Sequence, residues 1–384
     1  MFLGPIKALF LHCFIQMQLF MDGFFAHRLL TWYAGHRRFF PWRDTRNPYM
    51  IWISEIILQQ TRVSQGYDYF VRFIERFPDV ETLAEATEDD VLKCWQGLGY
   101  YSRARNLHCA ARQIVAAGKF PDDYENIRRL KGVGDYTAAA IASFAFGLPY
   151  AVVDGNVYRV LSRYFGITEP IDTTAGKKYF AGFARSLLPE GAEGADYNQA
   201  IMDFGALQCV PRSPLCAECP FADSCMAYRM NGVHDLPVKS RTLKVSERYL
   251  HYIYIQAEGE AAFFRREGKD IWKGLYEPFL IETGTPYTTT DLFTGDLLPD
   301  FVRQEGSEWR VLQENVRHQL THRTLICNFY RLDLKKKPLS KDFGRDVFWV
   351  SREEISRYAV PRLVSVLFER SGLMPSDSGE DREK

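Results

Sequence analysis

The strongest chemical signal in this chain is a group of four cysteines within one short stretch. They are Cys209, Cys216, Cys219 and Cys225, separated by six, two and five residues, with three prolines between them. Thiolates gathered in one compact loop can bind a single metal centre, either tetrahedral zinc or a cubane iron–sulfur cluster. Short four-cysteine zinc sites usually have two CxxC pairs, and this loop has one. The spacing therefore predicts a metal site and leaves both metals open.

A glutamate lies in surroundings that suit acid–base chemistry. Glu55 is part of Ile51-Trp-Ile-Ser-Glu-Ile-Ile-Leu-Gln-Gln-Thr61, and Ile51 and Leu58 fall on its own helical face. Burial among apolar side chains raises the pKa of a carboxyl group, so Glu55 could act as an acid near neutral pH. The plain alternative is a partly exposed carboxylate on an amphipathic helix. The apolar surroundings favour the buried acid.

A glycine turn and an aspartate follow further along the chain. In Leu130-Lys-Gly-Val-Gly-Asp-Tyr-Thr137, Gly132 and Gly134 flank Val133 and permit a tight turn at a helix start, whose backbone N–H groups can hold a phosphate. Asp154, in Val153-Asp-Gly-Asn156, begins another helical pattern. The plain interpretation of such an aspartate is a helix N-cap. Each feature alone occurs in many folds.

These side chains need a scaffold, which the bulk properties describe. At 384 residues the chain is too long for one typical core, so we expect two domains. A formal net charge of zero leaves nucleic-acid binding to local patches such as Arg128, Arg129 and Lys131. Eight cysteines over this length do not make a secreted disulfide scaffold. We therefore expect a cytoplasmic protein, associated with the nucleoid if it is bacterial.

The pattern along the chain divides it into parts. Residues 1–20 are apolar but too short a run to span a membrane, and we expect a non-native or disordered extension with the natural start at Met21. Residues 24–228 are mostly helical in pattern, and strands are expected at 249–255, 261–265, 324–334 and 347–350 with a helix at 352–370. The expected domains are 21–230, which contains the cysteine loop (209–225), a linker at 231–247, an α+β domain at 248–373 and a disordered tail at 374–384.

In combination these features resemble a known superfamily. The glycine turn, the alanine-rich helix after it and an aspartate at a helix start resemble the helix-hairpin-helix signature of base-excision DNA glycosylases. The cysteine loop resembles the iron–sulfur loop of their endonuclease III-like branch. The resemblance implies a mainly α, two-lobed helix-hairpin-helix glycosylase domain. It also implies a [4Fe-4S] cluster on the four cysteines, with Arg212 of the loop reaching a DNA phosphate.

Further segments narrow the resemblance to one family. Trp52-Ile-Ser-Glu-Ile-Ile-Leu-Gln-Gln-Thr61 resembles the catalytic helix of adenine DNA glycosylases of the MutY type, as do Pro41-Trp-Arg43, the segment 97–106 and the segment 198–205. Cleavage of an N-glycosidic bond makes the sugar cation-like, and a nearby carboxylate stabilises it. The resemblance implies that Glu55 protonates adenine at N7, Asp154 stabilises the sugar cation, and Asn156 orients Asp154 and the water.

The residue at position 136 predicts that the enzyme does not cleave the DNA strand. Bifunctional members of the superfamily place a lysine where this chain has Tyr136, and the lysine amine forms a Schiff base that leads to strand cleavage. A phenol cannot form a Schiff base, so we expect a monofunctional enzyme. We expect Tyr136 to hydrogen-bond to Asp154 during the reaction, with core packing as the plain alternative.

The resemblance also implies how DNA is engaged. A base must leave the stack before it can be excised. Gln60 and Tyr100 are expected to wedge beside the base on the other strand, and Tyr100 could equally be a core residue. The adenine pocket is expected to include Trp42, Arg43 and Gln199. The remaining expected DNA contacts are Thr61, Leu98, Gly132, Val133 and Gly134.

The α+β domain resembles the Nudix-like domain with which such glycosylases read 8-oxoguanine opposite adenine. The stretch after Gly274 has no acidic run to hold magnesium, so we expect no pyrophosphatase activity. The family's recognition loop reads Phe-Ser-His, and the corresponding stretch here is Leu320-Thr-His322. Thr321 keeps a hydroxyl and the aromatic residue is missing. Thr321 and His322 are the expected contacts, and a plain surface or strand histidine is the alternative for His322.

The sequence thus predicts a monofunctional adenine DNA glycosylase with an α+β Nudix-like second domain. Its expected partner is double-stranded DNA with adenine opposite 8-oxoguanine or guanine. We expect the protein to be a monomer that does not associate with a membrane. One alternative is a related iron–sulfur glycosylase for another mismatched base such as thymine. Thymine has no N7 to protonate, so Glu55 argues against it. The other alternative is a non-enzymatic, redox-sensing DNA-binding module.

Overall fold

The computed structural model describes residues 24–373 except 190, 192, 241–244 and 304. The chain divides into a first unit, Met1–Phe70 with Gln113–Thr242, and a second unit, Val71–Arg112 with Leu243–Lys384. The expected extension at 1–20 and the expected tail at 374–384 lie outside the described residues. The domain boundaries drawn from the sequence remain a prediction.

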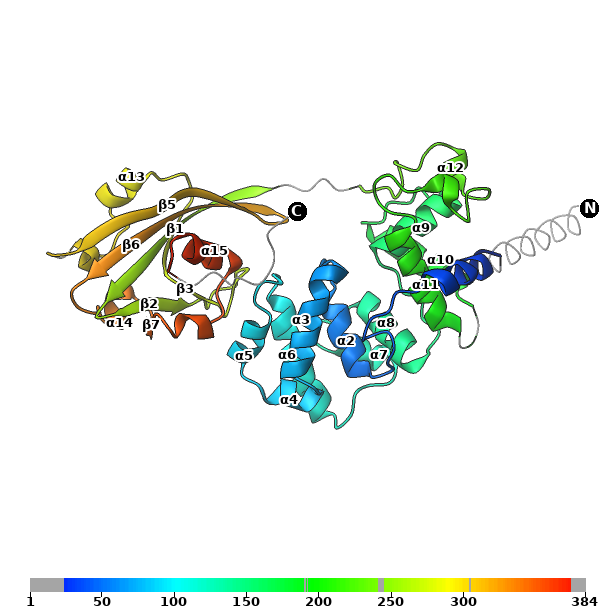
Figure 1. Cartoon of the computed structure of the whole chain (residues 1–384), viewed down its shortest axis with the longest axis horizontal. Coiled ribbons are helices and arrows are strands. Elements are labelled where there is room, and N and C mark those ends of the chain that lie inside the picture. The colour runs from blue at the N-terminus through cyan, green and yellow to red at the C-terminus, as the bar shows by residue number, and fades with distance from the viewer. Residues whose placement is uncertain (1–23, 190, 192, 241–244, 304, 374–384) are drawn as a thin grey trace, which may run out of the picture. The chain divides into compact units, whose positions relative to one another are not determined.

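The described part of the first unit contains helices and loops (Figure 1). A helix at residues 24–36 comes first. Two helices, α3 (Val63–Arg76) and α6 (Ser102–Ala116), run from one unit into the other. The other helices of this unit are α2 (Pro48–Ile57), α7 (Tyr124–Arg129), α8 (Asp135–Phe146), α9 (Gly155–Phe165), α10 (Thr174–Ser186), α11 (Glu193–Leu207), the 3-10 turn η1 (Cys216–Glu218) and α12 (Met226–Arg229).

Helix α2 is the central element of the first unit. Asn47 caps its start by accepting hydrogen bonds from the N–H groups of Tyr49 and Met50, and Pro48 occupies the first turn, where a missing N–H does no harm. All residues from Ile51 to Ile57 are buried. A helix that is apolar on nearly every side must be enclosed by its neighbours. The carboxyl group of Glu55 is therefore enclosed with it.

The expected helix-hairpin-helix is formed by α7, the glycine turn and α8. Gly132 has φ 80°, a backbone conformation that favours glycine, and Gly134 is the N-cap of α8. Helix α8 buries Ala138, Ala140 and Ala142, and it packs on α2 and α7. Small side chains allow these helices to approach closely. The hairpin is thereby attached to the helix that carries Glu55.

The second unit combines short helices with a mixed sheet. Helices α4 (Val80–Glu85) and α5 (Glu88–Cys94) precede α6. The sheet has the order β3-β2-β1-β6-β5, with β4 paired to β1 and β7 paired to β2. The strands are β1 (Ser246–Ala257), β2 (Glu260–Arg265), β3 (Tyr276–Glu277), β4 (Phe279–Thr283), β5 (Glu308–Gln319), β6 (Arg323–Leu334) and β7 (Phe348–Ser351). The helices beside them are α13 (Thr289–Thr294), η2 (Asp300–Arg303), α14 (Ser340–Phe343), η3 (Ile355–Arg357) and α15 (Arg362–Arg370).

Strands β1 and β6 form the centre of this sheet. They pair in parallel along their whole length, from Ser246 opposite Arg323 to Ala257 opposite Leu334. Strand β5 returns antiparallel to β6, and the N–H of Leu320 donates to the carbonyl of Arg323 at 2.7 Å to close the turn between them. This places Thr321 and His322 at the exposed tip of a hairpin.

The predicted fold class, a mainly helical part followed by an α+β part, is confirmed. Two elements differ from those expected from the sequence. The expected helix at 352–370 is interrupted before Pro361, because Ala359 uses its carbonyl to accept from the N–H of Tyr276. Strand β5 was not expected, since its residues are polar on both faces. Among the described residues, no helix combines the length and apolarity that crossing a membrane requires.

Candidate active site

A cavity of about 190 Å³ in the first unit gathers the four predicted catalytic residues and four of the predicted DNA contacts. Glu55 reaches it from α2, Tyr136 from α8, and Asp154 and Asn156 from the start of α9. The cavity is also lined by the predicted residues Trp42, Arg43, Thr61 and Gln199. Its apolar wall consists of Ile51, Leu58, Val63, Phe144, Met202 and Ala206. Polar groups thus converge in a largely apolar enclosure, which is typical of a binding or active site.

The carboxyl group of Glu55 has a strongly raised pKa in this cavity. The residue is 8% exposed, and the hydroxyl of Tyr136 donates to Glu55 Oε2 at 2.7 Å. Burial raises the pKa of Glu55 to about 7, and the Tyr136 hydrogen bond opposes that rise. A carboxyl group with this pKa is a substantial fraction protonated at neutral pH. It can therefore deliver a proton to a bound molecule.

Asp154 serves as a helix cap and also faces the cavity. One oxygen accepts the N–H of Val157 at 2.8 Å, and the other accepts Asn156 Nδ2 at 2.7 Å. Burial raises the pKa of Asp154, while these hydrogen bonds favour its ionised form. The N-cap interpretation and the catalytic interpretation are therefore compatible. The cap holds a carboxylate at a fixed place beside the cavity.

Arg159 connects the side-chain amide of Asn156 to the cysteine loop. Its Nη2 donates to Asn156 Oδ1 at 2.8 Å and to the carbonyl of Gly205 at 2.6 Å, and its Nε donates to the carbonyl of Cys209 at 2.7 Å. The approach between α9 and α11 depends on Gly205, because a Cβ there would lie 2.5 Å from the Cβ of Asn156. Arg159 and Gly205 therefore position Asn156, and through it Asp154. Neither was predicted from the sequence.

Asp203, which was also not predicted, forms ion pairs with two arginines of the cavity wall. Asp203 is fully buried and accepts hydrogen bonds from Arg43 at 2.6 and 2.8 Å and from Arg38. Burial opposes its ionisation, but the two arginines hold the pKa of Asp203 below its usual range. The predicted pocket residue Arg43 is thus fixed by a buried ion pair. On the same wall, Tyr33 donates to Gln199 Oε1 at 2.8 Å.

A more open groove of the first unit shares Tyr136 and Asp154 with the cavity. Gln60, Gly132 and Gly134 line it, so the predicted phosphate cradle and one predicted wedge lie on one surface with Asp154. Val133 is buried between the two glycines. Gln60 has φ 57°, an uncommon conformation for a residue other than glycine, and such strain concentrates at functional sites.

The four predicted ligands surround one small apolar cavity of the first unit. Cys209, Cys216, Cys219 and Cys225 all line it, together with Phe25, Phe221 and Leu215. Four cysteine thiolates are the usual ligands of a cubane cluster. Arg163 donates to the carbonyl of Val210 at 2.8 Å and so braces the loop, whose Arg212 is exposed.

The remaining predicted residues belong to the second unit. Tyr100 is 46% exposed and has φ 47°, so the second predicted wedge is also strained. Its hydroxyl lies 2.6 Å from Oγ1 of Thr321, at the tip of the β5–β6 hairpin. Leu98 is buried beneath the Tyr100 loop, and His322 is exposed. The exposure of Tyr100 does not fit the alternative of a core residue.

Three family models match separate stretches of the chain. They are the HhH-GPD superfamily base excision DNA repair protein over residues 53–181, the iron-sulfur binding domain of endonuclease III over 209–225, and the NUDIX domain over 251–370. The second match identifies the group on the four cysteines as an iron–sulfur cluster, as predicted. The three matches follow one another in the predicted order.

Named relatives match different shares of the chain. The adenine DNA glycosylase of Buchnera aphidicola subsp. Baizongia pistaciae is 32% identical over 319 residues, covering 79% of this chain and 84% of that protein. The adenine DNA glycosylase of Mus musculus is 41% identical over 216 residues, covering 53% of this chain and 42% of that protein. A solved thermostable thymine-DNA glycosylase has a TM-score of 0.51 at 33% identity and covers 54% of this chain and 97% of its own.

The Arg159 contacts lead to a prediction on stability. Substitution of Arg159 by Gln removes a buried charged donor from three acceptors at once and should lower the free energy of unfolding by about 2–4 kcal/mol. Urea denaturation measures it, with the exposed Arg185→Gln as the matched control. Equal stability of the two variants would contradict the role assigned to Arg159.

The cysteine cavity leads to a prediction on metal content. Protein purified without air should contain about four iron and four sulfide per chain, because a [4Fe-4S] cubane has that composition. Elemental analysis and acid-labile sulfide measure both, and Cys327→Ser, which changes a buried cysteine far along the sequence, should keep the full content. Stoichiometric zinc without iron would show the assignment to be wrong.

Proposed function

This chain belongs to the adenine DNA glycosylase family, and we propose that its substrate is double-stranded DNA with adenine opposite 8-oxoguanine or guanine. The observation that carries this proposal is the protonatable Glu55 in one cavity with Asp154. Adenine leaves poorly as an anion, so its departure needs an acid. The deoxyribose that stays behind needs a stabilising negative charge. The cavity supplies both.

The two carboxyl groups take different roles because their surroundings differ. Glu55 lies among the buried apolar residues of α2 and accepts a hydrogen bond from Tyr136. It therefore keeps a proton at neutral pH and gives it to adenine N7. Asp154 is held by a backbone N–H and an amide, which favour the carboxylate that stabilises the sugar cation. Asn156, fixed by Arg159, orients Asp154 and the incoming water. After adenine leaves, Glu55 is ionised and can accept the proton of that water.

Tyr136 supports a monofunctional reaction. The chain has a phenol where a strand-cleaving relative would have a lysine, and a phenol forms no Schiff base. Its hydroxyl donates to Glu55 in the absence of DNA. The contact of Tyr136 with Asp154 during the reaction remains a prediction. Release of adenine should therefore leave an abasic site in an unbroken strand.

Exposed groups in each of the two units support base flipping. The hairpin glycines can hold a phosphate by backbone N–H groups, and exposed Arg212 can reach another. Gln60 and Tyr100 are strained and exposed, as side chains that insert into a base stack would be. Trp42, Gln199 and Thr61 would line the pocket for the flipped adenine. Each of these DNA contacts is part of the proposal.

The hairpin tip of the second unit supports recognition of the opposite base. Thr321 and His322 are exposed there, and the Thr321 hydroxyl meets the hydroxyl of Tyr100. Leu320 takes the place of the aromatic residue usual in the family, so the hydroxyl pair would carry the reading of 8-oxoguanine. We further propose that the protein acts as a monomer in the cytoplasm, associated with the nucleoid in a bacterium.

Two alternatives make different predictions. The similarity to a solved thymine-DNA glycosylase covers 54% of this chain and 97% of that one. Removal of thymine would not need the buried acid, since thymine lacks N7. A redox-sensing binding module would need neither carboxyl group. The raised pKa of Glu55 beside Asp154 favours the adenine reaction.

The reaction is tested on duplexes that carry one defined mispair. We expect adenine release opposite 8-oxoguanine and guanine, with strand breaks only after alkali because Tyr136 forms no Schiff base. Gel analysis with and without alkali measures both outcomes, and a thymine:guanine duplex is the control. Excision of thymine with adenine left intact would show the substrate to be wrong.

The pH dependence tests the acid. Glu55 must be protonated to act, so the single-turnover rate should fall as pH rises through about 7. The Tyr136 hydrogen bond lowers the pKa of Glu55, so Tyr136→Phe should move this fall to higher pH. Glu55→Gln, as control, should lose roughly 10²–10⁴-fold at every pH. If the rate of Tyr136→Phe falls at the same pH as that of the unchanged protein, Glu55 is not the acid.

A further inference from the structure

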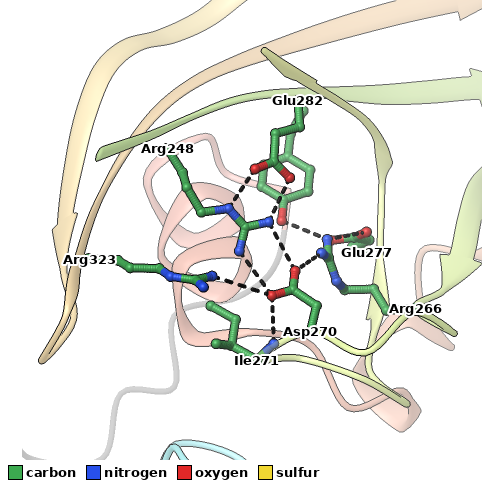
Figure 2. Close-up of polar contacts among 8 residues, drawn as sticks. Arg248, Arg266, Asp270, Ile271, Glu277, Glu282 and Arg323 are labelled. Carbon is green, nitrogen blue, oxygen red and sulfur yellow. Dashed lines mark hydrogen bonds and ion pairs between the residues drawn. The ribbon is translucent and has the colours of Figure 1, made fainter. Parts of the chain in front are cut away.

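Three arginines approach one carboxylate in the segment between β2 and β3, residues 266–275. Asp270 accepts hydrogen bonds from both terminal nitrogens of Arg248, at 2.9 and 3.0 Å, and from the N–H of Ile271 at 2.7 Å. Arg266 also donates to it, and Arg323 Nη1 lies 3.7 Å from Asp270 Oδ1. Figure 2 shows the three guanidinium groups turned toward this carboxylate. We call these residues the Asp270 cluster.

The charges of the Asp270 cluster are balanced by two further carboxylates. Arg248 donates to both oxygens of Glu282, at 2.5 and 2.6 Å, and Arg266 donates to both oxygens of Glu277 at 2.7 Å (Figure 2). Burial opposes ionisation of Asp270, but its hydrogen bonds hold its pKa well below the usual range. Without the Asp270 charge, the three arginines would share two carboxylates. Among the residues that the structure describes, Arg323 pairs with Asp270 alone, so it would lose its ion pair.

Arg323 connects the Asp270 cluster to the hairpin tip. It is the first residue of β6 and directly follows Thr321 and His322. Its carbonyl accepts the N–H of Leu320 at 2.7 Å, and the carbonyl of His322 accepts the N–H of Ser246 at 3.2 Å. The backbone that closes the turn thus belongs to the residue whose side chain Asp270 holds. A displacement of Arg323 would displace the tip.

The same segment also contacts the helices beside the Tyr100 loop. Arg105 Nη1, on α6, donates to the carbonyl of Lys273 at 2.5 Å. Gly274, with φ 84°, lies against α5 so closely that a Cβ would be 3.0 Å from the Leu92 side chain. The loop that carries Tyr100 connects α5 to α6. Residues 266–275 therefore contact both the helices that flank Tyr100 and the residue that follows the hairpin tip with Thr321.

We propose that Asp270 is a positioning residue for discrimination of the base opposite adenine. Through Arg323 it holds the hairpin tip where the hydroxyls of Thr321 and Tyr100 meet and can contact that base together. The inference rests on the proposed reading of the opposite base by Thr321. It assigns a role in specificity to acidic and basic groups of a Nudix-like domain that touch neither adenine nor the catalytic cavity of the first unit.

The test compares excision rates for two opposite bases, measured on the full-length protein under limiting enzyme. Asp270→Asn should lower the ratio of the rate opposite 8-oxoguanine to the rate opposite guanine by roughly tenfold, the size of one charge-assisted hydrogen bond. Arg323→Gln, a 42% exposed side chain with little risk to folding, should lower it similarly. Asp333→Asn is the matched control, since Asp333 pairs with Arg331 in the same sheet away from the tip.

The outcomes separate this inference from the proposed function. Equal losses with both opposite bases, or an unchanged ratio, in Asp270→Asn and Arg323→Gln would overturn the positioning role. Thr321→Ala is measured beside them. If Thr321→Ala lowers the ratio and the Asp270 and Arg323 variants do not, the inference fails and the proposed reading stands. If Thr321→Ala leaves the ratio unchanged, the proposed reading itself fails.

Discussion

The catalytic unit depends on one constraint, which is that a single carboxylic acid is kept away from water. Helix α2 is buried along nearly its whole length, and Glu55 shares that burial. Desolvation destabilises the charged form of a carboxyl group, and within the described part of the chain Glu55 accepts one side-chain hydrogen bond, from Tyr136. One hydrogen bond limits the pKa rise without cancelling it. The alanines of α8 and the close packing of α8 on α2 maintain the enclosure.

The second carboxyl group of the cavity differs from Glu55 in its partners. Asp154 caps α9, where backbone N–H groups favour negative charge, and its hydrogen bonds oppose the rise in pKa that burial causes. Asn156 and Arg159 extend these contacts to the cysteine loop through the carbonyl of Cys209. The cysteine loop is thus connected to Asp154 by hydrogen bonds.

Much of this organisation was predictable from the sequence, since it depends on local patterns. Cysteine spacing, the glycine turn and the apolar surroundings of Glu55 are all visible in short segments. The structure gathers the cysteines around one cavity and the four predicted catalytic residues around another. The partners of these residues were not predictable. Asp203 and Arg38, or Arg159 and Cys209, are far apart in the chain, and their pairing depends on how α9 and α11 pack. A buried aspartate within the segment 198–205 was the one signal for Asp203.

Strand β5 and the end of helix α2 were missed for a different reason. Strand β5 is polar on both faces and is held by pairing with β6, which local propensity does not reveal. Residues 24–228 are mostly helical in pattern, yet α2 ends at Ile57 and Gln60 takes a left-handed conformation. In both places the tertiary structure overrides the local pattern. The second of them is at a predicted functional residue, where such conflicts are expected.

The central claim is that Glu55 keeps its proton near neutral pH before DNA binds. A ¹³C NMR titration of glutamate-labelled protein measures this directly, with the Glu55 signal assigned by its loss in Glu55→Gln. The account predicts an inflection at about pH 7. An inflection near 4.5, the ordinary value for a glutamate, would contradict it.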